Sequence, residues 1–464
     1  MSTKPEKKQK NLDMTQGKPT KLLILFAIPM WIGGVFQLLY NLVDTIVVGR
    51  FVSTDALAAI GSTGSTMMLL SMVGGGLTNA ISVIISQAEG AKQNEGMKRS
   101  VTHAAYLALA AGIIMGLISF FGARPLMKLL QAPPEIIDQS VQYIQIVGGL
   151  LIGQMGYNAA TSVLRAIGDS RTPLYFLIFS SLLNVVLDLA FVLGLQAGVA
   201  GVASATVISQ IVSAVLCIGY MLRKYPKLRP DQEAWKLDTT LLKDYLKMGL
   251  PMSAQSAVLS IGDMIITAVI NSHGADIMAA YTIGSRVQNL ATITFSNIAF
   301  SFSVYSGQNF GAKKYDRIKS GLKEGLTLIC SLALVSTAVV LIFAKQLALI
   351  FMDADAAPQV LEAAIVMIRI QGTFFFALGS IWAMNSALRG MGLISITLVS
   401  SAVELISKIG FSLLLPLFMG YVGIWIAAPI GWVLGLIPSA ILLARWFKNP
   451  EKYAKRPSAE EKPM

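Results

Sequence analysis

Two aspartates lie deep inside segments that are otherwise apolar enough to cross a membrane. Asp44 ends the run Gln37-Leu-Leu-Tyr40-Asn-Leu-Val-Asp44, and Asp188 follows Asn184 by four residues. A charged side chain at the centre of a spanning helix costs at least about 2.5–3.5 kcal/mol. The six apolar segments of the first half contain no Lys or Arg that would neutralise these carboxylates. We therefore predict that the pair binds a cation or carries a proton.

Two further oxygen donors are expected at the same depth. Asn184 shares a helix face with Asp188 because the two are four residues apart. At 1.5 Å per residue, Asn184 and Asp188 lie about 17 and 23 Å from the cytoplasmic end of their helix, and Thr206 about 18 Å from that side. Asp44, Asn184, Asp188 and Thr206 would form an all-oxygen site suited to Na⁺. The same carboxylates could hold H⁺, since two close negative charges favour protonation of one. Both ions stay open, and no other cofactor is expected.

The second half carries charges of both signs inside its apolar segments, namely Asp263, Arg286, Arg369, Glu404 and Lys408. Glu404 and Lys408 are four residues apart, and this spacing predicts a salt bridge along one helix. Asp263 is expected to pair with Arg286 or Arg369, or to reach the outer interface. Because these charges can cancel, we place the coupling site in the first half.

A proline and a group of adaptable side chains surround the predicted site. Pro29 interrupts the first apolar segment upstream of Asp44, and Pro251 matches it in the second half. A proline inside a helix removes a backbone hydrogen bond, so Pro29 forms either a static kink or a hinge. Polar, aromatic and methionine side chains of these segments are expected to line a substrate cleft: Gln37, Tyr40, Asn41, Met155, Asn158 and Met252.

These residues belong to a chain whose composition suits lipid as its solvent. Of 464 residues, 54% are hydrophobic and only 13% are charged, whereas soluble domains carry about 25% charged residues. Segments near the roughly 20 residues needed to span a bilayer recur along the chain. We predict an all-α integral membrane protein with twelve spans, at 22–48, 56–86, 102–122, 139–163, 173–195, 198–221, 246–271, 278–307, 324–349, 361–388, 393–417 and 421–446.

The positions of the basic residues predict the orientation of these spans. The net charge is +12, and most of the 37 Lys and Arg residues fall in alternate loops that begin with the N-terminal tail. The opposite loops carry only Arg50, Arg124, Lys128 and Lys345. By the positive-inside rule, both termini are cytoplasmic in a multi-pass protein of the inner or plasma membrane. The charge therefore indicates contact with membrane lipid rather than a nucleic-acid partner.

The two halves of the chain resemble each other. Gln87 and Gly90-Ala-Lys92 recur as Gln308 and Gly311-Ala-Lys313, and Leu164-Arg165 recurs as Leu388-Arg389 at a similar spacing. Repeats of six helices share one orientation, which predicts two six-helix bundles related by a pseudo-two-fold axis along the membrane normal. We expect a cytoplasmic tail (1–21), a first lobe (22–221), a linker (222–245), a second lobe (246–447) and a second tail (448–464).

The sequence resembles the multidrug and toxic compound extrusion family from about residue 15 to about residue 447. The motifs that carry the resemblance are Pro29, the run Gln37 to Arg50, Ala56-Leu-Ala-Ala59, Gly90-Ala-Lys92, Leu164-Arg-Ala-Ile-Gly168-Asp169, the Asn184 and Asp188 pair, and Gly249-Leu-Pro251.

The resemblance implies a V-shaped, two-lobe exporter of amphipathic, often cationic small molecules, driven by inward Na⁺ or H⁺. It also implies a first-lobe cation site at Asp44, Asn184, Asp188 and Thr206. Some branches of the family place acids in the seventh and tenth helices. Here Gln255 and Arg369 lie in those helices, as in the branch named for a DNA-damage-inducible membrane protein.

Two other functions, a lipid flippase and a membrane enzyme, would need residues of a different kind. A lipid-linked oligosaccharide or lipid flippase of the same superfamily needs a cationic cleft to hold pyrophosphate, but the first-half interior is acidic. A polytopic enzyme would show a catalytic motif, and none accompanies the two histidines, His103 and His273. We expect a monomeric transporter with no obligate protein partner.

Overall fold

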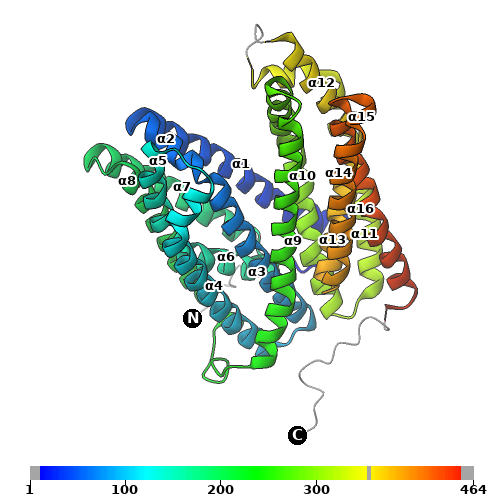
Figure 1. Cartoon of the computed structure of the whole chain (residues 1–464). Helices are drawn as coiled ribbons and strands as arrows, with labels where there is room; N and C mark the ends of the chain where they lie inside the picture. Colours follow the sequence, from blue (N-terminus) through cyan, green and yellow to red (C-terminus); the bar gives the residue numbers. More distant parts are fainter. Residues whose placement is uncertain (1–10, 353–356, 451–464) are drawn as a thin grey trace, which may run out of the picture.

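The computed structural model describes residues 11–352 and 357–450, apart from the side chains of Asn41 and Leu42. Within these ranges the chain forms helices and no strand. The helices gather into two bundles that meet at one end and diverge toward the other (Figure 1). The loops at the meeting end are rich in Lys and Arg, and we call this end the basic end.

The first bundle contains the helices of the first half, several of them broken. They are α1 (Pro19–Phe51), α2 (Thr54–Ser62), α3 (Gly64–Ala91), α4 (Asn94–Leu129), α5 (Pro134–Tyr143), the π-helix η1 (Ile144–Gly148), α6 (Leu151–Ala166), α7 (Arg171–Leu189), the π-helix η2 (Ala190–Gly194) and α8 (Gly198–Lys224). The short 3₁₀ helix η3 (Pro226–Leu228) follows on the connection to the second bundle.

The second bundle repeats this arrangement. Its helices are α9 (Thr239–Asn271), α10 (Ala275–Gly311), α11 (Tyr315–Leu349), α12 (Pro358–Thr373), α13 (Phe375–Gly390), α14 (Ile394–Leu414), α15 (Pro416–Met419) and α16 (Val422–Lys448). Each bundle therefore provides six of the twelve spans, and the fold class predicted from the sequence is confirmed.

Ten of the spans are apparent from length and hydropathy, and the other two are not. In the described ranges, nine helical segments pass such a test alone, and α12 with α13 forms a tenth span bent by 50°. The remaining two are the interrupted α5–η1–α6 and the polar helix α10. The polar residues of α10, among them Ser301, Ser306, Gln308 and Asn309, are buried between helices. Protein neighbours rather than lipid therefore surround this face of α10.

Helix α1 belongs to both bundles. Near its start, Leu23, Phe26 and Ala27 pack in a hydrophobic cluster with Phe302 of α10 and Trp446 of α16. Near its end, Val48 packs instead in a first-bundle cluster with Ala56, Val192, Val199 and Val202. The residue range 22–221 was expected to form one lobe, but the start of α1 lies in the core of the other. The helix therefore links the two bundles mechanically.

The contribution of α1 to the second core is testable by truncating one aromatic ring. Phe26 is 0% exposed, whereas Phe36 on the same helix is 39% exposed. We expect Phe26→Ala to lower the free energy of unfolding by roughly 3–5 kcal/mol, because it leaves a cavity in a packed core. Phe36→Ala is the matched control and should change it little. Equilibrium unfolding in denaturing detergent measures both, and equal effects would contradict a role for α1 in that core.

Candidate functional site

Two carboxyl groups meet inside the first bundle. Asp44 of α1 and Asp188 of α7 lie within hydrogen-bonding reach of each other. Asp188 is 0% exposed, and Asp44 is half-buried. Two carboxyl groups can hydrogen-bond only when one of them carries a proton, because an ionised carboxylate has no donor. The arrangement is therefore suited to holding one proton between the two acids.

Asn184 and Thr206 complete this cluster. With the Asn184 amide oriented to satisfy its neighbours, its oxygen accepts from the Thr206 backbone N–H at 3.1 Å. Its nitrogen then donates to Asp188 Oδ2 at 2.9 Å and to the Tyr40 hydroxyl at 3.2 Å. The structure thus brings together the four residues singled out for cation coupling. It adds Tyr40, which the sequence analysis had assigned to the substrate cleft.

One oxygen of each acid remains without a partner. Asp44 Oδ1 and Asp188 Oδ1 are both buried, and neither has a hydrogen-bond partner among the residues that the structure describes. A buried polar atom without a partner is rare in proteins and needs a functional or structural explanation. Here both free oxygens belong to the contacting acids, so the cluster has unused capacity to accept a proton or a cation.

The cluster offers oxygen atoms that either H⁺ or Na⁺ could use. A shared proton suits the carboxyl pair because the two groups are already in contact. For Na⁺, the carboxylates and the Thr206 hydroxyl are available, and the Asn184 oxygen would join them with its amide turned the other way.

Tyr143, the last residue of α5, was not predicted from the sequence. It is half-buried, and it lies close enough to both acids and to Tyr40 to feel their charges. A tyrosine in an apolar segment is common, so the sequence offered no signal for it. Tyr143 lies directly before the π-helix η1, which separates α5 from α6.

The residues expected in a substrate cleft lie in different environments. Gln37 is exposed and Asn158 is half-buried. Met155 and Met252 are 1% and 2% exposed, within hydrophobic clusters, and they present no surface to a cleft in this conformation. The side chain of Asn41 lies outside the described residues.

Among the described residues of the second bundle, no comparable pair of acids lies at the matching place. Gln255 of α9 donates to the Thr397 carbonyl and to the Ser401 hydroxyl of α14. The predicted Glu404–Lys408 bridge is wrong, and so is the pairing of Asp263 with an arginine. In the described part of the chain, the Lys408 ammonium bonds Asp263 at 2.8 Å.

Helix packing explains this difference. Gly262 lets α9 approach Leu405 of α14 closely, and Lys408 can then reach across to Asp263. The Glu404 side chain instead packs against Gly435 of α16. Arg286 lies over the Phe351 ring, 5.9 Å from its centroid.

Pro29 lies where α1 passes from one bundle to the other. It is buried, and the helix continues through it. Just beyond it, Gly33 faces Leu177 of α7 in the first bundle, and Gly34 faces Ile293 of α10 in the second. The helix therefore has a weakened hydrogen-bond ladder between its second-bundle anchor and Asp44.

Comparisons with known proteins agree with this architecture. The family model described as MatE matches residues 29–190 and 251–414, one segment in each bundle. The segments begin at the paired prolines, Pro29 and Pro251.

Individual relatives cover nearly the whole chain. "Probable multidrug resistance protein YoeA" of Bacillus subtilis (strain 168) is 25% identical over 449 residues, 95% of this chain and 92% of that protein. "Probable multidrug resistance protein YpnP" of the same organism is 27% identical over 418 residues, 89% and 92% of the two chains. A solved structure described as "MATE in the bent conformation" superimposes with a TM-score of 0.89 at 23% identity, covering 97% of this chain and 100% of the other.

Proposed function

Since this chain belongs to the MatE family of multidrug efflux transporters, we propose that it exports amphipathic, often cationic small molecules in exchange for inward protons. It is a multi-pass membrane transporter rather than an enzyme. The observation that carries the coupling proposal is the contact between the Asp44 and Asp188 carboxyl groups inside the first bundle.

The basic end faces the cytoplasm in this proposal, because Lys and Arg concentrate in loops on that side. The protein then lies in the plasma or inner membrane with both termini inside the cell, and a single chain forms the transport unit. The bundles diverge on the opposite side (Figure 1), so this conformation faces outward.

Proton binding would be coupled to transport through the charge of the acid pair. With one proton between them, Asp44 and Asp188 attract each other; without it, two adjacent negative charges repel in an apolar interior. A cationic substrate near the unprotonated pair would be attracted, and protonation would weaken that attraction. A ligand shifts a conformational equilibrium only through its different affinity for the two states. Proton and substrate thereby compete, as antiport requires.

Helix α1 is the element that transmits this change. Asp44 lies in its first-bundle part, and Leu23 and Phe26 anchor its start in the second-bundle core. Pro29 lies between these parts, so movement of Asp44 relative to Asp188 can bend α1 there. A lipid flippase remains the second candidate, although the acidic interior suits a cation better than pyrophosphate.

Neutralising either acid should abolish gradient-driven export. We expect Asp44→Asn and Asp188→Asn each to reduce efflux at least tenfold while the protein remains folded, because the pair loses its exchangeable proton. Efflux from proteoliposomes under separately imposed H⁺ and Na⁺ gradients is the measurement. Asp263→Asn and Gln255→Ala in the second bundle are the controls and should be much less impaired.

Three results would contradict parts of this proposal. Near-normal export by a purified Asp188→Asn variant would exclude the first-bundle site. Export driven by the Na⁺ gradient alone would assign Na⁺ as the coupling ion. A loss of activity in Gln255→Ala as large as in Asp188→Asn would move coupling into the second bundle.

Pro29→Ala should impair turnover more than substrate binding. Alanine restores the missing hydrogen bond and favours a straight α1 by about 3 kcal/mol, whereas the acids remain in place. Substrate affinity by fluorescence on detergent-purified protein and efflux rate in vesicles are compared for the same variant. Pro429→Ala in α16, a helix confined to one bundle, is the matched control. Unchanged efflux would show that Pro29 is a static kink, and joint loss of binding and efflux would show that it shapes the cleft.

A further inference from the structure

The repeated Gln-x-x-Gly-Ala-Lys motif joins the two bundles at their cytoplasmic end. Gln87 Nε2 of α3 donates to the Gly390 carbonyl of α13 at 2.8 Å. Gln308 Nε2 of α10 donates to the Ala166 carbonyl of α6 at 2.7 Å. Each glutamine thus reaches from its own bundle to the last residue of a helix in the other. The two hydrogen bonds are equivalent under the internal repeat.

The acceptor carbonyl groups explain why glutamine suits the contact between the bundles. The last carbonyl groups of a helix have no partner within that helix and must be satisfied from outside. Ala166 ends α6 and Gly390 ends α13, so each bundle offers one such carbonyl to the other. A glutamine amide supplies the donor without adding charge to the interface.

The glycines of the same motif let the bundles approach this closely. A Cβ atom on Gly90 would overlap the Gln308 carbonyl, and one on Gly311 would overlap the Gln87 carbonyl. The backbones of α3 and α10 are therefore in direct contact at this level. The motif combines the donor with the close approach that its hydrogen bond needs.

One of the two hydrogen bonds is covered by residues 11–17, which we call the strap. Gln308 Oε1 accepts from the Met14 backbone N–H at 3.0 Å, and Asn309 Nδ2 donates to the Met14 carbonyl at 2.9 Å. The Met14 side chain is 0% exposed. The strap also touches the first bundle, where the Leu12 N–H donates to the Gly168 carbonyl at 3.3 Å. Gln308 is 1% exposed beneath it.

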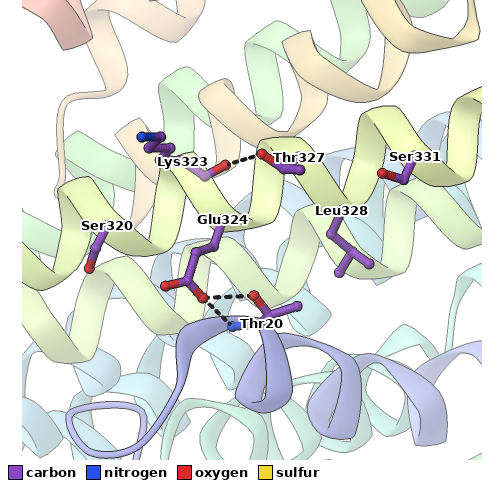
Figure 2. Close-up of a pocket in the computed structure, with 7 residues that line it drawn as sticks. All are labelled: Thr20, Ser320, Lys323, Glu324, Thr327, Leu328 and Ser331. Carbon is purple, nitrogen blue, oxygen red and sulfur yellow. Dashed lines mark hydrogen bonds between the residues drawn. The ribbon is translucent and has the colours of Figure 1, made fainter.

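The chain after the strap stays attached to the second bundle. Glu324 of α11 accepts from the Thr20 backbone N–H at 3.2 Å and from its hydroxyl at 2.7 Å, at the first turn of α1 (Figure 2). Arg317 Nη2 donates to the Gly17 carbonyl at 3.0 Å. If the bundles part at the cytoplasmic end, the strap and the first turn of α1 would therefore stay with the second bundle. The strap would then separate from Gly168 of the first bundle.

We propose that Gln87 and Gln308 form the cytoplasmic gate of the transporter, as paired positioning residues whose two hydrogen bonds hold the outward-facing state closed. Both bonds break when the bundles part to admit substrate from the cytoplasm. Because the strap covers Gln308 alone, the Gln308 bond is the stronger of the two. This inference rests on the proposed alternating access, and it names the contacts that open.

The test measures the separation of the bundles directly. Spin labels are placed at two exposed cytoplasmic positions by Asn94→Cys and Lys319→Cys, after Cys217→Ala and Cys330→Ala remove the native thiols. Distances are recorded in full-length protein in nanodiscs. Gln87→Ala and Gln308→Ala should each raise the ratio of cytoplasm-open to closed molecules by roughly two- to tenfold, as expected for loss of one neutral hydrogen bond between the bundles. Gln308→Ala should have the larger effect.

Two further variants separate gating from packing. Gln308→Glu keeps the side-chain size and removes the donor, so it should open the gate as alanine does. Gln255→Ala removes a buried glutamine whose hydrogen bonds stay within one bundle, and it should leave the distances unchanged. Thermal unfolding of each variant checks that it is folded.

The outcomes distinguish this inference from the proposed function. Unchanged distances in folded Gln87→Ala and Gln308→Glu proteins would overturn the gate, whatever the efflux assay shows. Equal shifts in Gln255→Ala would reduce the glutamines to general packing residues and would also overturn it. A shift confined to the two gate positions would support the gate even if neither a proton nor a sodium gradient drove export.

Discussion

An ionised carboxylate is costly inside an apolar bundle, and the first bundle places two carboxyl groups in contact. In the part of the chain that the structure describes, neither acid has a basic neighbour to neutralise it. Asp188 is fully buried, and the Asn184 amide donates to it. This donor stabilises one negative charge but does not suffice for two. In the proposed mechanism a proton supplies the missing positive charge, and α1 carries Asp44 so that it can respond when the proton binds.

The path of α1 explains how a local change at the acids can reach the other end of the molecule. The helix carries Asp44 in the first bundle and places Phe26 in the core of the second. Its start is held by Glu324, and the strap before it covers Gln308 at the interface. Pro29 lies between these attachments, where the missing backbone hydrogen bond makes α1 easiest to bend. One continuous helix thus connects the acid pair, Pro29 and the end at which the two bundles meet.

Much of this arrangement was predictable from the sequence, because depth in the membrane can be counted along a helix. Counting placed Asn184, Asp188 and Thr206 at one level, where the structure finds them. Counting residues along a helix gives depth, but it cannot show against which other helices that helix packs. Apolar residues such as Leu23 and Phe26 suit either bundle, so the shared position of α1 was not visible. Lys408 likewise bonds Asp263 instead of Glu404, because the close packing of α9 on α14 decides the pairing. Tyr143 gave no signal, because a tyrosine in an apolar segment is common and its neighbours depend on how the helices pack.

The internal repeat is kept at the gate and lost at the site of coupling. Gln87 and Gln308 donate equivalent hydrogen bonds across the interface, one from each bundle. This symmetry suits an interface between two bundles that move as rigid units. If the second bundle repeated the pair of acids, a second buried negative charge would need to be neutralised in each transport cycle. There, Gln255 bonds helix α14, and Lys408 neutralises Asp263. The second bundle can then act as a stable anchor for α1, and in the proposed mechanism proton binding in the first bundle alone drives the movement of both.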